Sequence, residues 1–129
     1  MPFVTRTLPE DPTVTAPDGS DVRVLAHGRC GSMARFTLAP GKVSRAVRHR
    51  TVGEIWYLVA GRGRMWRSLN GEEETIDLWR GAALAIPLGA RFQFRNDGQR
   101  PLVAVAVTMP PWPGENEAVC ARGPWRPTA

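Results

Sequence analysis

The sequence predicts a single all-β domain, a β-sandwich or small barrel built of short strands. The chain has 129 residues, enough for one ordinary core and too few for two. Its 13 glycines and 12 prolines make up 25 of the 129 residues, about 19%, which is well above the usual combined share of roughly 12%. So many turn-forming residues argue against a helical bundle. Many short runs alternate polar and apolar residues, and no helix-period segment exceeds about two turns.

The expected strands follow one another at short intervals along the chain. Residues 21–26 and 33–38 alternate polar and apolar side chains, as half-buried strands do. After a turn at 39–41, further strands are expected over residues 43–50, 54–60, 64–69, 75–79, 82–86, 91–95 and 102–109. Turns are expected at Gly61-Arg62-Gly63, Asn70-Gly71 and Asn96-Asp97-Gly98. Roughly ten short strands at this spacing are typical of an antiparallel sandwich or barrel.

The domain has three expected parts. Residues 1–20 are rich in proline, aspartate and threonine and are expected to be extended and broken by turns. Residues 21–110 form the barrel. Residues 111–129 hold Trp112 and Trp125 among several prolines. Because exposed indoles are costly, this segment is expected to pack along the barrel wall or across its mouth, without forming a strand.

The charge balance gives little information about a partner. Lysine and arginine total 17 against 12 acidic residues, a formal charge of +5, and Lys42 is the only lysine. The arginines are spread from Arg6 to Arg126, and no basic stripe with interleaved aromatic residues appears. We therefore expect no nucleic-acid partner. A few of these arginines could still hold an anionic small ligand, since a guanidinium suits carboxylate and phosphate.

The cysteines and the hydropathy pattern indicate a cytoplasmic protein. Cys30 and Cys120 are the only two cysteines, without CxxC or zinc-site spacing, so two free thiols are expected. The first residues lack the basic and apolar regions of a signal peptide. No window approaches the 18 apolar residues of a membrane span, so no membrane partner is expected.

Two glycine-punctuated stretches, residues 41–61 and 81–96, carry a family resemblance. The first has Gly41, His49, Glu54 and Gly61 at motif spacing, and the second has Gly81, Pro87, Gly89 and Asn96. Together they resemble the two motifs of the cupin superfamily, over about residues 20–110. The resemblance implies a single-domain cupin barrel, the jelly-roll-like double-stranded β-helix. The last residues resemble the tails of small bacterial cupins of unassigned role.

Two motif positions depart from the family pattern. In metal-binding cupins the motifs supply a His-x-His pair, a glutamate and a further histidine, and the matching positions here are Val47, His49, Glu54 and Phe92. Valine and phenylalanine cannot coordinate a metal, which leaves fewer than the usual three protein ligands. We therefore expect no cofactor and no dioxygenase-type chemistry. If a divalent metal is bound, the resemblance implies His49 and Glu54 as ligands, with others recruited from elsewhere.

The resemblance implies that alternating side chains on three strands form a pocket wall inside the barrel. Alternation places Arg45, Val47 and His49 on one face, Glu54 and Trp56 on another, and Phe92 and Phe94 on a third. His49 and Glu54 are the candidate catalytic residues, a hydrogen-bonded dyad with His49 as base and Glu54 orienting it. The other five are candidate substrate-binding residues. Each has a structural alternative: a buried pair without chemistry, ordinary aromatic core, or a solvated arginine.

The expected function is small-molecule binding inside the barrel. Its catalytic form is metal-independent proton transfer by His49 and Glu54, as in isomerisation, epimerisation, dehydration or cyclisation. Two alternatives stay open, a metal-dependent cupin enzyme with a non-standard ligand set and a non-catalytic ligand-binding or structural cupin. The expected partners are a small-molecule ligand and a second copy of the chain, since many small cupins pair through sheet contacts.

Overall fold

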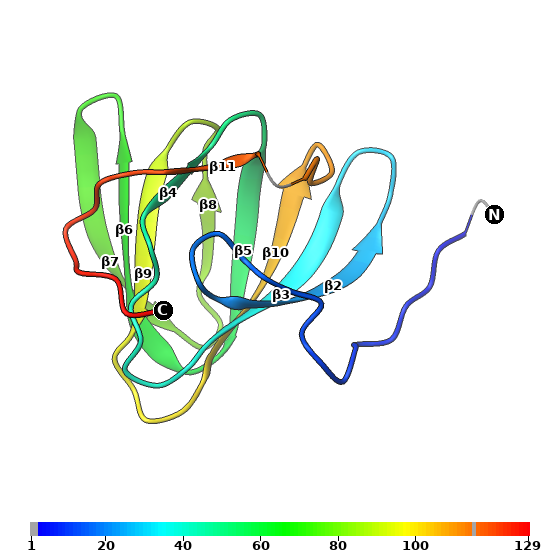
Figure 1. The fold of residues 1–129 in the computed structure, drawn as a ribbon, viewed down its shortest axis with the longest axis horizontal. Helices are drawn as coiled ribbons and strands as arrows, with labels where there is room; N and C mark the ends of the chain where they lie inside the picture. Colours follow the sequence, from blue (N-terminus) through cyan, green and yellow to red (C-terminus); the bar gives the residue numbers. More distant parts are fainter. Residues whose placement is uncertain (1–2, 115) are drawn as a thin grey trace.

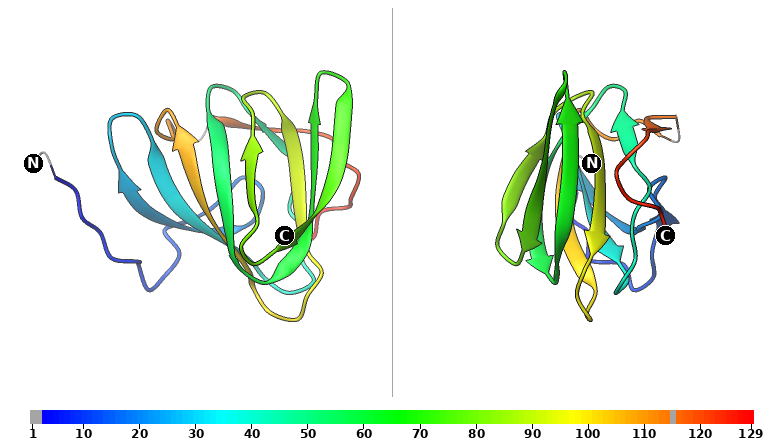
Figure 2. Two further views of the ribbon diagram at one scale, coloured as in Figure 1. Left: turned by 180° about the vertical axis from the view of Figure 1, so that it is seen from behind. Right: turned by 90° about the vertical axis from the view of Figure 1, so that its left-hand side faces the viewer.

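Two antiparallel β-sheets face each other in the computed structural model, which describes residues 3–114 and 116–129 (Figure 1). This all-β arrangement confirms the predicted fold class. The described residues form no helix, so they contain none that is long and apolar enough to span a membrane. Residues 3–13, before β1, form an extended and largely exposed segment that leads away from the sheets (Figures 1 and 2).

The chain crosses repeatedly between the sheets, which brings sequence-distant strands together. One sheet has six strands in the order β1 (Val14–Thr15), β2 (Asp21–His27), β3 (Ser32–Leu38), β10 (Leu102–Met109), β5 (Gly53–Ala60) and β8 (Ala83–Ile86). The other has five in the order β11 (Ala118–Cys120), β4 (Val47–His49), β9 (Arg91–Asn96), β6 (Arg62–Leu69) and β7 (Glu72–Trp79). Because β4 and β5 lie in opposite sheets, their inward side chains meet across the interior.

The motif glycine Gly61 and the Asn70-Gly71 pair show how two of the turns are made. Asn70 and Gly71 have φ values of 53° and 82°, the left-handed geometry of a two-residue hairpin turn between β6 and β7. Gly61 has φ 85°, and a Cβ there would lie 2.6 Å from the Pro101 carbonyl oxygen. Gly61 does not close a hairpin as expected, because it carries the chain from β5 in one sheet to β6 in the other.

One predicted strand is shorter than the sequence indicates. Residues 43–50 yield only β4, with Val43 making an isolated bridge to Arg95. The strand is interrupted because Arg45 N–H donates to the carbonyl of Asp18 at 2.7 Å, drawing this backbone to the N-terminal segment. Strand pairing resumes at Val47, opposite Phe92 of β9.

The C-terminal residues include a strand that the sequence did not predict. β11 pairs with the otherwise free edge of β4, with Ala118 opposite His49 and Cys120 opposite Val47. An unpaired edge offers a row of backbone donors and acceptors, so three residues suffice to add a strand. Further along, the Trp125 ring lies beneath the guanidinium groups of Arg64 and Arg95, 5.7 and 5.3 Å from its centroid. The tail therefore runs along the five-stranded sheet (Figure 2).

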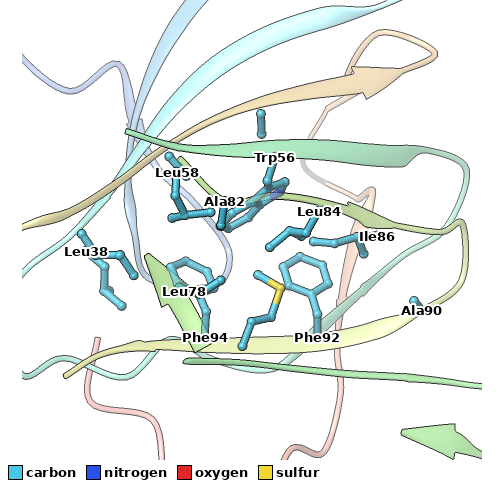
Figure 3. Packing of buried hydrophobic residues seen from close by; sticks show 14 of the residues in the cluster. Leu38, Trp56, Leu58, Leu78, Ala82, Leu84, Ile86, Ala90, Phe92 and Phe94 are labelled. Atoms are coloured by element: carbon cyan, nitrogen blue, oxygen red, sulfur yellow. The ribbon is translucent and has the colours of Figure 1, made fainter. Parts of the chain in front are cut away.

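The hydrophobic core occupies the space between the sheets around β5, β8 and β9 (Figure 3). Trp56 is its largest member, and it packs edge-to-face with Phe94 at 5.0 Å and with Phe92 at 6.2 Å. Leu58 and Met65 are completely buried beside them. This close packing fills one part of the interior and leaves the other, toward β2 and β3, for a cavity.

Candidate functional site

A cavity of about 410 Å³ opens between the β2–β3 part of the six-stranded sheet and strand β4 of the other sheet. Its volume is within the range of small-molecule sites. Most of its wall is apolar, and the N-terminal and C-terminal segments both contribute to it. The lining residues are Val14, Ala16, Pro17, Asp18, Val22, Val24, His27, Ser32, Met33, Ala34, Phe36, Val47, His49, Glu54, Trp56, Phe92, Pro111, Trp112 and Ala118.

Glu54 is a buried carboxyl group in the cavity wall. Alternation along β5 turns both Glu54 and Trp56 inward, and Glu54 is only 4% exposed. The Trp56 indole Nε1–H donates to Glu54 Oε2 at 2.7 Å, which fixes one carboxyl oxygen. Oε1 remains for another partner. Phe36 stacks on Trp56 at 5.5 Å and continues the aromatic wall.

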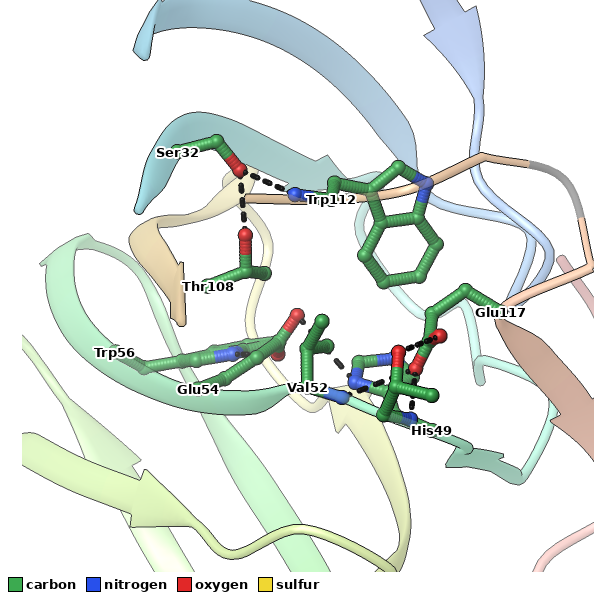
Figure 4. A network of polar contacts seen from close by, with 9 residues as sticks. Ser32, His49, Val52, Glu54, Trp56, Thr108, Trp112 and Glu117 are labelled. Atoms are coloured by element: carbon green, nitrogen blue, oxygen red, sulfur yellow. Dashed lines mark hydrogen bonds and ion pairs between the residues drawn. The ribbon is translucent and has the colours of Figure 1, made fainter. Parts of the chain in front are cut away.

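His49 lies next to Glu54 but is not hydrogen-bonded to it (Figure 4). The distance from His49 Nδ1 to Glu54 Oε1 is 3.7 Å, beyond hydrogen-bonding range. Nδ1 has no partner among the described residues. The edges of Phe92 and Trp112 pack around the imidazole, with ring centroids at 5.2 and 5.0 Å. The two side chains are therefore brought together as expected, without the expected dyad hydrogen bond.

Burial shifts the two ionisable groups in opposite directions. It raises the pKa of Glu54 to about 7, because an apolar environment disfavours the carboxylate, and the nearby Asp18 adds to the rise while the Trp56 hydrogen bond opposes it. Burial lowers the pKa of His49 to about 4, which the Glu117 carboxylate partly offsets. Near neutral pH the imidazole is uncharged, and Glu54 exchanges a proton with its surroundings.

The C-terminal segment closes over this pair through Trp112 and Glu117 (Figure 4). Trp112 N–H donates to Ser32 Oγ at 2.9 Å, and Ser32 shares a second hydrogen bond with Thr108. Glu117 is buried and accepts hydrogen bonds from Thr51 N–H at 2.6 Å, the Thr51 hydroxyl at 2.5 Å and Val52 N–H at 3.1 Å. These contacts tie the tail to β3 and to the loop that follows β4.

Five of the seven candidate residues line the cavity, and two do not. Val47, His49, Glu54, Trp56 and Phe92 all contribute to its wall. Phe94 lies in the core instead, packed against Trp56.

The second candidate residue that does not line the cavity is Arg45, whose side chain is exposed. Strand alternation does not reach Arg45, because regular pairing begins only at Val47. No cationic Arg or Lys side chain lies among the lining residues in the described part of the chain.

The sequence reading missed Asp18. This carboxyl group comes from the N-terminal segment, is 5% exposed and lines the cavity. Asp18 Oδ1 accepts hydrogen bonds from the backbone N–H and the hydroxyl of Ser20, at 2.9 and 2.6 Å. The Asp-Gly-Ser triplet signals a turn, and Gly19 has φ 93°. Nothing in the local sequence shows which side of the sheets that turn covers.

The donor set does not fit a metal ion. No group of three or more His, Cys, Asp or Glu side chains is arranged to hold one within residues 3–114 and 116–129. Val47 and Phe92 stand in the wall beside His49, where they add apolar surface and no ligand atom.

A family model described as "Cupin domain" matches residues 34–108. The chain belongs to the cupin family, which agrees with the two-sheet fold and with the motif spacing. The matched range includes β3 to β10 and contains His49 and Glu54, whereas Asp18 and the C-terminal tail lie outside it.

Known relatives share the fold at low sequence identity. An uncharacterized protein of Methanocaldococcus jannaschii is 28% identical over 107 residues, 79% of this chain and 82% of the relative. Bacillus subtilis oxalate decarboxylase superposes with a TM-score of 0.71 at 20% identity, covering 86% of this chain and 30% of that chain. One study of that enzyme names its Mn(II) centres. CapF superposes with a TM-score of 0.67 at 16% identity, covering 78% of this chain and 31% of that chain.

Proposed function

We propose that this cupin binds a small molecule in the cavity beside Glu54 and moves a proton on it. The observation that carries the proposal is a buried carboxyl group and a neutral imidazole in the wall of one apolar cavity. Buried ionisable groups are costly to a fold, and clefts that contain them are candidate active sites. The presence of Phe92 and Val47 at positions of the family's metal ligands supports a reaction that needs no metal.

Glu54 is the proton carrier in this proposal, and His49 is its neutral neighbour. A group whose pKa is about 7 is matched to proton exchange near neutral pH. A pKa of about 4 makes His49 a weak base near neutral pH, so this proposal gives Glu54 the role of base that was expected of His49. Its imidazole packs between Phe92 and Trp112, where it limits the access of water to the carboxyl group.

The supported reaction class is proton abstraction from carbon next to a carbonyl group. The Glu54 carboxylate takes the proton, the C–H electron pair moves toward the carbonyl oxygen, and Glu54 returns a proton to the same or a neighbouring carbon. This step accounts for isomerisation and epimerisation without an outside oxidant or reductant. In a dehydration Glu54 gives the proton instead to the departing hydroxyl group, whose C–O bond breaks and which leaves as water. The aromatic wall formed by Trp56, Phe36 and Phe92 would hold the apolar part of the substrate.

Hydrogen–deuterium exchange of phenylacetone in D₂O tests this proposal. We expect the wild-type protein to accelerate loss of the α-proton NMR signal, with a rate that rises through an apparent pKa near 7. Glu54→Gln should lower the rate at least a hundredfold, because general-base catalysis contributes roughly 10²–10⁴. Glu74→Gln, an exposed change of the same type on β7, is the matched control.

The same assay separates the alternatives. Exchange that disappears with EDTA and returns with one divalent metal would show a metal-dependent cupin. If phenylacetone binds but its exchange is not accelerated, the protein is a non-catalytic binding protein. Equal rates for the wild type and Glu54→Gln would contradict the assignment of Glu54.

We also propose a cytoplasmic homodimer without a nucleic-acid partner. Cys30 and Cys120 are exposed free thiols, which suits a reducing compartment. Ile55 and Tyr57 are half exposed on the outer face of the six-stranded sheet, which supports pairing of two copies there.

A further inference from the structure

The charges around the cavity all have one sign. Two carboxyl groups, Asp18 and Glu54, line it and are each about 95% buried, whereas no arginine or lysine within residues 3–114 and 116–129 does so. The buried histidine, His49, is uncharged near neutral pH. The other, His27, also lines the cavity, and its side chain is exposed. A carboxylate or phosphate ligand would therefore find no arginine or lysine among the described lining residues, and its charge would lie in a low-dielectric space beside two acidic groups.

Asp18 has one oxygen committed to the protein and one that is not. Ser20 donates to Oδ1 twice, which holds the Pro17–Ser20 turn in place. Oδ2 accepts no side-chain hydrogen bond from the described residues and belongs to the cavity wall. A carboxylate in an apolar cavity has lost most of its hydration, and a ligand that supplies a charged donor compensates for that loss.

Few charged or polar side chains lie near Asp18 or near Glu54. Burial raises the pKa of Asp18, and this effect outweighs the lowering by the Ser20 hydrogen bonds and, to a smaller extent, by the Arg45 charge. Glu54 faces Trp56, His49 and, through the cavity, Asp18. Glu117 faces His49 from the tail and is satisfied by Thr51 and Val52. No lining side chain balances Asp18 and Glu54 from within the cavity.

We propose that Asp18 anchors a protonated nitrogen, so that the cavity selects an apolar organic amine, with the ammonium group at Oδ2 of Asp18. This inference rests on the proposed small-molecule function and names its substrate class. The aromatic rings of Trp56, Phe36, Phe92 and Trp112 surround the apolar body, and aromatic faces also attract cations. Glu54 remains available for proton transfer at the other end of the ligand. Asp18 is thus the specificity-determining residue.

Three matched probes test the inference by calorimetry at pH 7.5. 2-Phenylethylamine, 2-phenylethanol and phenylacetate share an aromatic body and differ in charge. We expect the amine to bind at least tenfold more tightly than the alcohol, and phenylacetate to bind most weakly. Because Asp18 and Glu54 are raised in pKa, binding of the amine at pH 6 should also release protons, seen as a dependence of the heat on the buffer.

Asp18→Asn is the decisive variant, since the asparagine oxygen can still accept both Ser20 hydrogen bonds and keep the turn. It should reduce the preference for the amine over the alcohol to less than threefold and leave binding of the alcohol within threefold. Asp21→Asn removes the same charge from an exposed neighbour outside the cavity and should change neither. A purely structural role for Asp18 would weaken the amine and the alcohol alike.

The failure of this inference can be distinguished from failure of the proposed function. If the alcohol or phenylacetate binds as tightly as the amine, or Asp18→Asn keeps the preference, the amine assignment is wrong and the binding cavity stands. If none of the three probes binds at 10 mM, the cavity is not a ligand site for such molecules, and the proposed function falls with the inference.

Discussion

Burial acts on His49 and Glu54 with opposite signs because one is charged when protonated and the other when deprotonated. Both side chains then prefer their neutral forms, so no full ion pair forms across the 3.7 Å between Nδ1 and Oε1. Both groups are neutral in the folded protein between their two pKa values, about 4 and about 7. This range is where the fold tolerates the site at the lowest cost.

The His49→Gln variant should be less sensitive to acid than the wild type. The folded-state pKa of about 4 lies below the ordinary 6.5, so the unfolded chain takes up a proton that the folded protein refuses as pH falls from 6.5 toward 4. At about 1.4 kcal/mol per pKa unit, the wild type loses about 3 kcal/mol that the variant keeps. Urea unfolding at pH 7.5 and pH 4 measures the difference.

His27→Gln is the control for this prediction, because His27 is the other histidine and is exposed. It should follow the wild type at both pH values. If the free energy of unfolding of His49→Gln changes with pH as the wild type's does, His49 is not held neutral by burial, and the electrostatic description of the site is wrong.

Motif spacing and strand alternation predicted part of this site, and the rest depends on long-range contacts that local sequence does not show. Motif spacing located His49 and Glu54, and period-two alternation placed Val47, Trp56 and Phe92 in the wall. Asp18 could not be located, because the path of a turn-broken segment depends on long-range contacts such as the hydrogen bond between the Asp18 carbonyl and Arg45 N–H. Alternation also fails where pairing stops, as it does at Arg45.

At the scale of elements, the outer face of the six-stranded sheet is apolar across several strands. Ile55 and Tyr57 of β5 are 50% and 53% exposed. Register places Val107 and Val105 of β10 opposite them on one side, and Ala85 and Ala83 of β8 on the other. Side chains opposite each other in adjacent strands lie on one face, so these residues form a continuous apolar surface.

Ile55→Lys should disrupt the proposed homodimer. Adding a charge to the centre of an apolar interface leaves it unpaired on association, so the dimer dissociation constant should rise more than tenfold. Sedimentation equilibrium should give twice the 14.2 kDa chain mass for the wild type and the single-chain mass for the variant.

Thr75→Lys places the same charge on exposed β7 of the other sheet and should leave the dimer intact. A wild-type protein that stays at the single-chain mass up to 100 µM would contradict the dimer. If Ile55→Lys still dimerises, the interface lies on another surface and the proposed one is wrong.

Most strand positions follow from the sequence because turn chemistry and alternation are local. Asn70-Gly71 set a hairpin, and expected strands such as 102–109 match the observed bounds. Sheet membership is not local, so the crossing at Gly61 was read as a hairpin turn. The strand β11 was missed because its partner, the edge of β4, lies about 70 residues earlier in the chain.

At the scale of the whole molecule, two sheets and two terminal segments enclose one apolar space. The core fills the part around β5, β8 and β9, while the N-terminal turn with Asp18 and the C-terminal segment with Trp112 complete the wall of the rest. The family match covers residues 34–108 and so excludes both terminal segments. Asp18 and Trp112 thus show that part of the cavity wall comes from outside the range that matches the family model.

The pKa of Glu54, measured by ¹³C NMR of the glutamate side-chain carboxyl groups, tests the central claim most directly. Glu54→Gln assigns the resonance by its disappearance. A midpoint near 7 is expected, because burial in the apolar cavity disfavours the carboxylate. A midpoint near the ordinary 4.5 would show a solvated carboxyl group and would contradict both the buried site and its role in proton transfer.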